Sequence, residues 1–557
     1  MDRLIECVPN FSEGRDHATL DAISAAIEGV DGVWLLDVDP GKATNRTVFT
    51  FVGAPEAVIE GALAAARAAG ERIDMAQHEG EHPRFGAMDV CPLVPVRGVT
   101  MDECVAYART LGQRLGEEQG RTVYLYESAA TRPERRNLAT VRAGEYEALP
   151  GRLASGDHAP DFGPATFDPA WGATAVGARN FLIAYNVNLN TTSPRRANAV
   201  AFDVREKGRI LREPDPLTGE IVRDEAGEPV WKPGSLRCVK GIGWFIEEYG
   251  VAQVSMNLTD LAVTPLHVAF DECDARARAR GLRVTGSEAV GLVPLEALLD
   301  AGRHYLRLQH RTTGVPDREL VHIAVKSMGL DELGPFDPDE KVIEYAIARR
   351  AARSRLVDRT LGGFIEETAS ESPAPGGGSV AAAVGALGAA LGTMVANLSS
   401  HKRGWDDRWE EFSEVAERGK RCHSELTALV DRDTDAFNEI MAAWRVEGDE
   451  ARKEAIQAAT RLAIEVPLQV MRASLEALEV CQLMATDGLQ ASLSDAGVGA
   501  LCARLAARGA LLNVRINAKD LTDEAARSDY LSDAATLDAR AAELEAAVLA
   551  AVDAGLA

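Results

Sequence analysis

The sequence has 557 residues, of which 46% are hydrophobic and 26% are charged. At about 150 residues per domain, this length predicts roughly three to four folding units, and the composition excludes an intrinsically disordered chain. Asp and Glu outnumber Lys and Arg by 85 to 60, which gives a formal charge of −25. This balance argues against nonspecific binding to nucleic acid or to an anionic membrane, because both need a basic surface.

The cysteines and the N-terminus indicate a cytoplasmic protein. The eight cysteines are scattered singly, with no C-x-x-C pair. This pattern favours reduced thiols over disulfides or a zinc ribbon. The first ten residues, MDRLIECVPN, contain no long apolar run, so no signal peptide is expected.

The first 180 residues predict alternating strands and helices. Amphipathic helices are expected at residues 16–28, 55–69 and 102–118. The predicted strands around them are LIECVPNF, VWLLDVD, RTVFTFVG, MDVCPLVPV and TVYLYE. Strands interleaved with helices indicate an α/β subdomain, 1–180, in which helices cover one face of a sheet.

A second set of the same kind spans residues 181–338. Its strands are FLIAYNVNL, AQVSMNL and SEAVGLVP, and its helices are expected at 266–279 and 295–306. Residues 212–234 are rich in Pro, Gly and charge, which predicts a surface hairpin or a mobile loop. We therefore expect a second α/β subdomain of similar size.

Strand signals end near residue 356. From there to residue 557, Ala, Leu and Glu recur with the period of an α-helix. This part predicts an all-α helical bundle, and the helical, basic segment 339–355 is expected to link it to the preceding subdomain. The predicted fold is thus α/β, with two similar sheet-plus-helix subdomains, followed by an all-α bundle domain.

One segment of the predicted bundle is free of charge. Residues 380–398 carry no charged side chain and contain Gly388-x-x-x-Gly392, a spacing known from closely packed membrane helices. The segment consists mostly of Ala and Gly, which are only weakly hydrophobic. A helix buried among other helices of a soluble bundle is therefore favoured over a membrane span.

The string His78-Glu79-Gly80-Glu81-His82 matches H-E-x-x-H, the pattern of zinc peptidases. Zinc binding requires a helix, and Gly80 inside the motif and Pro83 after it both oppose one. Two histidines beside carboxylates also suit general acid–base catalysis near neutral pH. A solvated polar turn is the remaining alternative.

Two further segments could belong to a site. The strand VWLLDVD places Asp37 and Asp39 on one face, with Asp39 at its end, where either a site or an ordinary turn is expected. The Gly- and Pro-rich residues 160–174 could line a cleft for a flat aromatic ligand, or simply connect the two subdomains.

The predicted bundle offers two candidates. Gly376, Gly377, Gly378 and Ser379 open the charge-free helix, where exposed N–H groups and the helix dipole favour an anion, although close helix packing explains the glycines equally well. On the helix expected at 425–441, Asp433 falls on the apolar stripe, which is formed by Leu426, Leu429, Val430, Ala436, Phe437 and Ile440. A buried carboxyl group has a raised pKa and can move protons, or it can pair with a buried hydroxyl group or Arg.

These residues lie within long strings that resemble known enzymes. The strings that resemble glutamate formimidoyltransferase are ECVPNFSEGRD, LLDVDPGKATNRTV, HEGEHPRFGAMDVCPLVPVRGV, RAGEYEALP, APDFGP, WGATAVGARNFLIAYNVNLN and GLVPLEALLDA. The strings that resemble formimidoyltetrahydrofolate cyclodeaminase are SPAPGGGSVAAAVGALGAALG, ELTALVDRDTDAF, SLSDAGVGA and LNVRINAKDLTD. In this order the strings resemble the bifunctional formimidoyltransferase-cyclodeaminase family of histidine degradation.

The resemblance implies two reactions on folate. The first transfers the formimino group of N-formimino-L-glutamate to N5 of tetrahydrofolate, and the family's acid–base histidine corresponds to His82. Glu79 and Asp39 are expected to orient it, on position and charge. The family's folate-binding loop corresponds to residues 163–172. From this loop we expect contacts to folate by Gly163, Pro164, Phe167, Trp171 and Gly172.

The second implied reaction closes the formimino group onto N10, which gives 5,10-methenyltetrahydrofolate and ammonia. The family's catalytic aspartate corresponds to Asp433, and residues 376–379 would approach the folate. Tetrahydrofolate is expected as co-substrate, in a polyglutamylated form that a basic track could bind. The residues of that track would be Lys402, Arg403, Lys420 and Arg421.

The resemblance also implies a cytoplasmic homo-oligomer that binds formiminoglutamate and folate, without a metal, nucleic acid or membrane. Three alternatives remain at this point. The chain could retain one of the two activities, act as a folate-binding scaffold with inactive sites, or be a zinc peptidase that uses the H-E-x-x-H letters.

Overall fold

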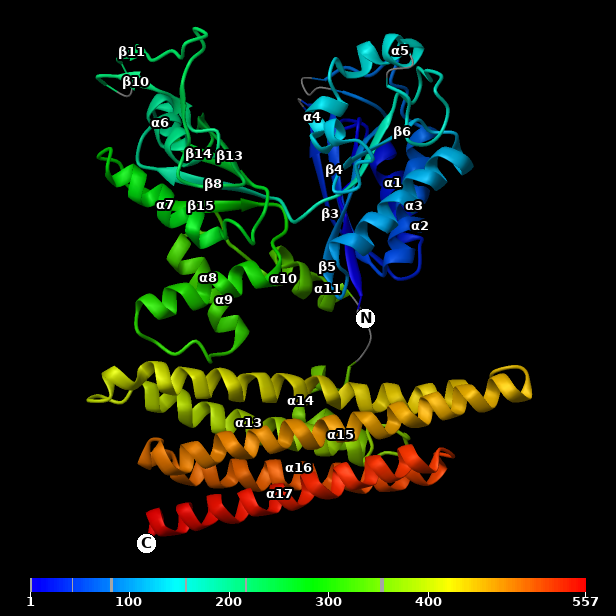
Figure 1. The fold of residues 1–557 in the computed structure, drawn as a ribbon, viewed down its shortest axis with the longest axis vertical. Helices are drawn as coiled ribbons and strands as arrows, with labels where there is room; N and C mark the ends of the chain where they lie inside the picture. Colours follow the sequence, from blue (N-terminus) through cyan, green and yellow to red (C-terminus); the bar gives the residue numbers. More distant parts are fainter. Residues whose placement is uncertain (1–2, 43, 81–83, 156–157, 216–217, 351–354) are drawn as a thin grey trace. The chain divides into compact units, whose positions relative to one another are not determined.

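The computed structural model describes residues 3–42, 44–80, 84–155, 158–215, 218–350 and 355–557. The chain divides into two compact units, which are described separately. The first unit comprises Met1–Ala301 and Val325–Ala352, and the second comprises Gly302–Ala324 and Arg353–Ala557. The first contains two sheets with their helices, and the second is helical (Figure 1).

A mixed sheet of seven strands begins the first unit. Strand β3 forms one edge beside β4; β1 and β2 follow in line, and then come β5, β7 and β6. β7 pairs in parallel with β5 and β6, and the other pairings are antiparallel. The strands are β1 Leu4–Cys7, β2 Asn10–Phe11, β3 Val33–Gly41, β4 Arg46–Gly53, β5 Met88–Arg97, β6 Val123–Glu127 and β7 Thr174–Ala178.

Helices cover one face of this sheet, as the sequence predicts. α1, α2 and α3 lie on the same side of the strands (Figure 1). Their apolar side chains and those of the strands form one buried core, because each element carries its apolar residues on a single face. The helices of this part are α1 His17–Glu28, α2 Pro55–Gly70, α3 Met101–Gln119, α4 Leu138–Val141 and α5 Glu145–Ser155, with a 3₁₀ turn at Pro133–Arg136.

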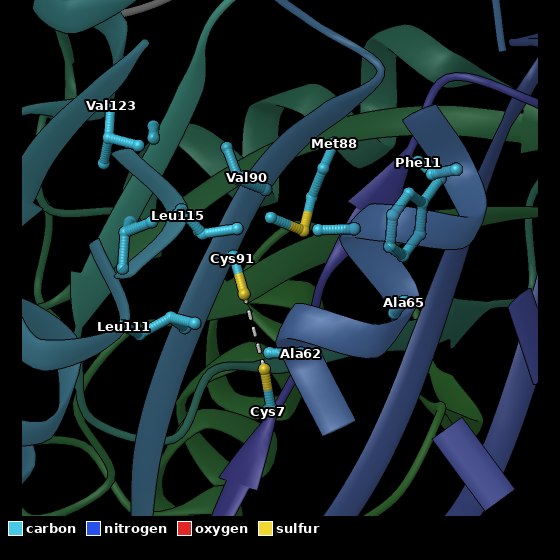
Figure 2. Packing of buried hydrophobic residues seen from close by; sticks show 14 of the residues in the cluster. Cys7, Phe11, Ala62, Ala65, Met88, Val90, Cys91, Leu111, Leu115 and Val123 are labelled. Atoms are coloured by element: carbon cyan, nitrogen blue, oxygen red, sulfur yellow. Dashed lines mark hydrogen bonds between the residues drawn. The ribbon is translucent and has the colours of Figure 1, made fainter. Parts of the chain in front are cut away.

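Figure 2 shows part of that core. Ala62 of α2 and Leu111 of α3 point toward the strands, where Cys7 and Cys91 lie with their Sγ atoms 3.5 Å apart. Both thiols are fully buried, and burial raises the pKa of Cys7. All eight cysteines of the chain are free thiols. The Cys7 and Cys91 side chains thus act here as small apolar residues.

A second sheet, of four antiparallel strands, follows in the order β13-β14-β8-β15. Its strands are β8 Ile183–Leu189, β13 Val239–Ile246, β14 Val251–Leu258 and β15 Val284–Val290. Its helices are α6 Pro194–Val204, α7 Leu266–Arg278, α8 Leu295–Leu308, α9 Asp317–Met328, α10 Pro338–Lys341 and α11 Ile343–Arg350. α11 packs Ile343 and Ala346 against the first sheet, beside Leu4, Leu36 and Val52.

The segment that the sequence marks as a hairpin or loop contains short ladders. β10 pairs with β11. β12 pairs with β9, the strand that precedes β10 in the chain. The strands are β9 Arg209–Ile210, β10 Arg212–Glu213, β11 Glu220–Ile221 and β12 Trp231–Lys232. In its described residues the segment is therefore a short-stranded hairpin, one of the two predicted forms.

The second unit is a bundle of long helices, in which α13 packs between α14 and α16. A Cβ atom on Gly388 would come within 2.6 Å of the Gly499 carbonyl oxygen, so the close approach of α13 to α16 requires glycine. The helices are α12 Leu361–Thr368, α13 Gly377–Ser400, α14 Trp409–Ala443, α15 Asp449–Asp487, α16 Leu493–Asn517 and α17 Glu524–Leu556, with 3₁₀ turns at Leu356–Asp358, Asp406–Arg408, Gln490–Ser492 and Ala518–Asp520. The predicted fold class, α/β followed by an all-α bundle, is confirmed.

The bundle also includes a segment that the sequence assigns to the α/β part. The turn between α8 and α9 belongs to the second unit. Thr312 and Thr313 are buried, and their side chains hydrogen-bond to Asn397 and Ser413 at 2.9 and 3.1 Å. A Cβ atom on Gly314 would overlap Ala416, so this turn lies tightly against α14.

α13 is the charge-free helix. Within the described residues, it is the one helix long and apolar enough to cross a membrane by length and composition alone. In its most apolar window, 56% of the residues are buried inside the unit. The helix thus packs as a core helix of the bundle, although part of its surface is exposed.

Candidate functional sites

The first candidate site lies where the H-E-x-x-H segment follows α2. His78, Glu79 and Gly80 adopt no helical structure, and the rest of the motif, including His82, lies outside the described residues. His78 is 8% exposed, and its Nε2 lies 2.8 Å from the carbonyl oxygen of Asn45. Asn45 in turn donates to the carbonyl oxygen of Glu79 at 2.9 Å. Asn45 therefore holds this part of the motif against the start of β4.

Asp39 lies at the end of β3 on the same sheet. It pairs with Val48, which also pairs with Asn10, so all three side chains share the sheet face away from α1–α3. The Asp39 side chain is exposed. Burial and the charge of Asp39 raise the pKa of the neighbouring Asp37. The Asp39 side chain is thus accessible, and its role stays a prediction. The Glu79 side chain is also exposed.

A cluster of charges that sequence reasoning missed occupies this end of the sheet. The carboxylate of Asp89 is fully buried and forms ion pairs with Arg46 and Arg142. Arg142 contacts it with two nitrogens, including Nε at 3.1 Å, and Arg46 also donates to Asn10 at 3.1 Å. Burial lowers the pKa of Arg142 to about 10, so it remains a cation at neutral pH. An Asp inside the strongly apolar strand MDVCPLVPV is the signal that points to such a cluster.

The glycine-rich loop 160–174 lies beside the H-E-x-x-H segment. Its far end bonds to the chain around that segment: the Met75 N–H donates to Ala170 at 2.9 Å, and Gly172 forms a bridge with Gly86. Gly163 and Gly172 both have positive φ, 78° and 76°, which favours glycine. The structure thus brings together these two segments, which are about 80 residues apart in sequence.

The aromatic residues of this loop differ in exposure. The Trp171 ring is buried under Arg121, whose guanidinium lies 4.1 Å from the ring centre. Phe167 is half-buried and packs on Tyr146 at 5.3 Å between ring centres. Pro164 is half-buried and Gly163 is exposed. Trp171 therefore supports the loop from below, whereas the residues from Gly163 to Phe167 present accessible surface.

The second candidate site lies in the helical unit and centres on Asp433. Its Oδ2 accepts hydrogen bonds from the backbone N–H and the hydroxyl group of Ser379, at 2.8 and 3.0 Å. Within the described residues, Asp433 forms no ion pair with any cation. Burial raises the pKa of its carboxyl group, and the two bonds from Ser379 oppose that rise only in part.

Glycines surround this carboxylate at the start of α13. Gly376 is the N-cap and Gly378 is buried against Asp433, where a Cβ atom would overlap the carboxylate. On the other side, a Cβ atom on Gly377 would lie 4.0 Å from the side chain of Asn513 on α16. The helix N-terminus, Asp433 and Asn513 thus converge, and the glycines allow a close approach of backbone to a ligand.

The predicted apolar stripe of α14 is confirmed in most positions. The buried members are Leu426, Leu429, Val430 and Ala436, and Ile440 is half-buried. The expectation that Phe437 lies in the core is wrong, because its side chain is exposed. The neighbouring Asp431 accepts the N–H of Leu356 at 2.6 Å, so it caps another segment instead.

Two of the basic residues considered for a folate tail already have partners. The Lys420 ammonium lies 2.6 Å from Asp317, and that of Lys402 lies 3.7 Å from the centre of the Trp405 ring. Arg403 and Arg421 are exposed. Among the residues that the structure describes, no group of three or more His, Cys, Asp or Glu side chains could hold a metal ion.

Three family profiles match consecutive parts of the chain. The N-terminal subdomain of the formiminotransferase domain matches residues 4–179, and the formiminotransferase domain matches residues 184–348. The formiminotransferase-cyclodeaminase profile matches residues 360–536. The order of the three matches follows the order of the two sheets and the bundle.

Relatives match either the whole chain or one part of it. The chain is 45% identical over 529 residues to the formimidoyltransferase-cyclodeaminase of Mus musculus, which covers 94% of both chains. It is 40% identical over 309 residues to the glutamate formimidoyltransferase of Streptococcus pyogenes serotype M1, covering 56% of this chain and 95% of that one. It is 35% identical over 192 residues to a methenyltetrahydrofolate cyclohydrolase of Methylorubrum extorquens, covering 34% of this chain and 92% of that one.

Proposed function

The chain belongs to the formimidoyltransferase-cyclodeaminase family, and from that premise we propose which residues carry its two activities. It is a bifunctional glutamate formimidoyltransferase and formimidoyltetrahydrofolate cyclodeaminase that uses tetrahydrofolate as substrate. We assign the transfer to subdomains 1–180 and 181–338, and the cyclodeamination to 356–557, with 339–355 as the linker. The three profile matches support this division.

We propose His82 as the acid–base residue of the transfer. N5 of tetrahydrofolate attacks the amidine carbon of formiminoglutamate and forms a tetrahedral intermediate. His82 accepts the proton that N5 loses and returns a proton to the departing glutamate nitrogen, so that the intermediate collapses to 5-formiminotetrahydrofolate. An imidazole suits both transfers near neutral pH. Glu79 and Asp39 would orient or polarise it.

For the cyclodeamination we propose Asp433 as the proton carrier. N10 attacks the protonated amidine carbon, and Asp433 accepts the N10 proton. The same proton then passes to the amine of the tetrahedral intermediate, which leaves as ammonia and yields the methenyl cation. A carboxyl group with a raised pKa suits both directions of transfer. The observation that carries this proposal is the half-buried Asp433, which has no cationic partner in the described chain and lies beside a glycine-lined helix N-terminus.

We propose that Gly376, Gly377, Gly378 and Ser379 bind the folate beside Asp433. The N-terminus of α13 provides backbone N–H groups, and the absence of Cβ atoms allows close approach. In the first site, Gly163, Pro164, Phe167 and Gly172 would contact folate, with Trp171 supporting them. The substrate in this proposal is a polyglutamylated tetrahydrofolate, whose tail would extend toward basic residues outside the two sites.

We propose that neither reaction uses a bound metal. An H-E-x-x-H zinc site needs both histidines on one face of a helix. The described part of the motif has no helical structure, and His78 uses Nε2 for the Asn45 carbonyl oxygen. A zinc peptidase would contain about one zinc ion per chain that is lost in His78→Ala, which metal analysis would detect.

We propose that the active form is a homo-oligomer. Adjacent faces of α13 and α16 leave large apolar side chains exposed at helical spacing, and a surface of this kind favours contact with a second copy. The exposed residues are Leu387, Met394 and Leu398 on α13 and Val498, Leu501, Leu505, Leu512 and Ile516 on α16. In light-scattering measurements, Leu505→Asp should lower the oligomer mass, whereas Leu483→Asp on α15 should not.

We place the reactions in histidine degradation in the cytoplasm. Formiminoglutamate is the formimino donor of the first step, and a reaction that degrades an imidazole ring must supply it. The eight free thiols are consistent with a reducing compartment.

The two site assignments are tested by one spectrophotometric assay, which follows methenyltetrahydrofolate. The wild-type chain should form it from formiminoglutamate and tetrahydrofolate. His82→Ala should abolish this reaction but still convert 5-formiminotetrahydrofolate, and Asp433→Ala should stop at that intermediate. If His82→Ala retained the transfer, or Asp433→Ala the cyclodeamination, that assignment would be wrong. A chain inactive in both assays would be a folate-binding scaffold.

A further inference from the structure

Arg142 has hydrogen-bonding capacity that the described chain does not use. Its Nε and Nη2 contact Asp89, and that carboxylate is shared with Arg46. Nη1 has no acceptor among the described residues, and it is not enclosed by the protein. Glu145 is close enough for its charge to act on Arg142, but it forms no ion pair with it in the described chain. Arg142 therefore presents a fixed, partly uncompensated positive charge.

The cluster is continuous with the H-E-x-x-H segment. Asp89 pairs with Arg46, and the residue before Arg46 is Asn45, whose carbonyl oxygen accepts the hydrogen bond from His78. The side chains of Arg46 and Arg142 are only 12% and 16% exposed. The charge of Arg142 is thus held in a largely buried position, connected through Asp89 and Arg46 to Asn45, which accepts the hydrogen bond from His78.

A second polar group in this segment also lacks a partner. A carbonyl oxygen can only accept, so His78 donates from Nε2–H to Asn45, which leaves a lone pair on Nδ1. Nδ1 is buried and has no hydrogen-bond partner in the described chain. An unpaired buried acceptor is unfavourable unless a ligand or water donates to it. Arg142 Nη1 and His78 Nδ1 are therefore two polar groups of this connected set of residues that have no partner within the described chain.

We propose that Arg142 binds the α-carboxylate of formiminoglutamate, and that His78 Nδ1 accepts an N–H of the same molecule. This proposal rests on the transferase function proposed above. Formiminoglutamate carries an α-carboxylate on the carbon attached to its amidine nitrogen, next to the reacting carbon. The glutamyl carboxylates of folate also suit an arginine, but the p-aminobenzoyl group separates them from N5. A carboxylate site beside the acid–base segment therefore favours the formimino donor.

Arg142→Gln tests the carboxylate contact. It should raise the KM for formiminoglutamate about 10- to 100-fold, the range for losing a hydrogen bond to a charged group. The KM for tetrahydrofolate and the rate of cyclodeamination should change less than about twofold, which also reports a folded chain. Arg142→Lys should recover part of the loss, because it restores the charge without the planar fork. Arg114→Gln is the matched control, because Arg114 is likewise held by carboxylates, Glu60 and Glu118, but on α3.

A donor without the α-carboxylate tests the same contact from the substrate side. N-formimino-4-aminobutyrate differs from formiminoglutamate by that group alone. The wild-type enzyme should use it about as poorly as Arg142→Gln uses formiminoglutamate. The variant should no longer distinguish the two donors, as expected when both changes remove one interaction. His78→Phe should raise the KM for both donors, because its contact is to the amidine.

Direct binding separates this proposal from the proposed function. Calorimetry with glutamate, the product of the transfer, should detect binding to the wild-type chain and at least tenfold weaker binding to Arg142→Gln. A wild-type chain that binds glutamate through Arg142 but transfers no formimino group would refute only the function. The proposal is overturned if Arg142→Gln raises the KM for tetrahydrofolate instead, or if it still distinguishes the two donors as the wild type does.

Discussion

Each of the two candidate sites contains an aspartate that is removed from solvent, fully for Asp89 and partly for Asp433, and the groups around the two carboxyl groups differ. In the first sheet, Asp89 is fully buried and pairs with two guanidinium groups, Arg46 and Arg142. In the bundle, Asp433 receives two hydrogen bonds from Ser379 and has no ion pair within the described residues. Burial therefore raises the pKa of Asp433, whereas the guanidinium groups favour the charged form of Asp89.

The contrast suggests different roles for the two aspartates: Asp89 suits substrate binding and Asp433 suits proton transfer. A carboxylate held between two cations keeps its charge and fixes the directions of both arginines, which suits recognition of an anion. A carboxyl group that is desolvated without a cation has a raised pKa and can both accept and donate a proton, which suits proton transfer. The net charge of −25 is thus compatible with anionic substrates, because Arg46 and Arg142 provide a local excess of positive charge.

Removing Asp89 should have the largest effect. Asp89→Ala leaves two largely buried guanidinium groups without their carboxylate, and breaking a buried ion pair in this way costs about 3 to 5 kcal/mol. We expect that loss in the free energy of unfolding of the first unit, measured by urea denaturation. Asp433→Asn should cost the second unit much less, because no cation loses its partner. Equal losses at the two positions would refute the contrast drawn here.

Gly378→Ala should have the next largest effect, on activity. Its methyl group would overlap the Asp433 carboxylate and displace it. A displacement of this size costs up to about 100-fold in rate, so kcat for cyclodeamination should fall about 10- to 100-fold while the transfer is unchanged. Gly362→Ala on α12 is the matched control, because nothing lies within 4 Å of the added atom and Gly362 is outside the proposed folate site. Similar losses in both variants would mean that the carboxylate position does not limit the reaction.

Local sequence patterns singled out Asp433 of the bundle, but not the charge cluster of the first sheet. Asp433 lies on an apolar helical stripe whose members are within eight residues of it, so the period of one helix was enough to single it out. Arg142 and Asp89 are 53 residues apart. Their contact depends on how α4 returns to β5 of the first sheet, and no short pattern encodes that return.

The same limit explains which parts of the fold were missed. The strands with regular alternation were predicted, but β7 and β13 were not, because glycines interrupt their patterns at Gly177, Gly241 and Gly243. The docking of residues 302–324 onto the bundle was also missed. Composition marks where helices replace strands, but it does not show which core a turn such as Thr312–Gly314 joins. Phe437 was expected in the core because a helical wheel shows which side of the helix a side chain faces. It does not show how far the neighbouring helices extend along that side.

The contrast also predicts a pH dependence of stability. The pKa of Asp433 is higher in the folded chain than its ordinary value of 3.8. Below that value both states are protonated; as pH rises, the unfolded state loses its proton first, so this group lowers stability until pH exceeds the folded pKa. Asn does not titrate. The unfolding free energy of Asp433→Asn relative to wild type should therefore increase as pH rises above about 4, and a decrease would show that the carboxylate is stabilised when charged.

The smallest effect should come from Ser379→Ala, which removes one of the two donors to Asp433 and leaves the backbone N–H in place. One net hydrogen bond contributes about 0.5 to 1.5 kcal/mol, so the bundle should remain folded. Because the lost bond favours the charged form, the pKa of Asp433 should rise further. The acidic limb of the pH–rate profile for cyclodeamination should then move to higher pH, since N10 must transfer its proton to the carboxylate form. Thr427→Val, on the same helix but with its hydroxyl group bonded to the carbonyl oxygen of His423, should leave that limb in place; a shift in both variants would trace the effect to repacking.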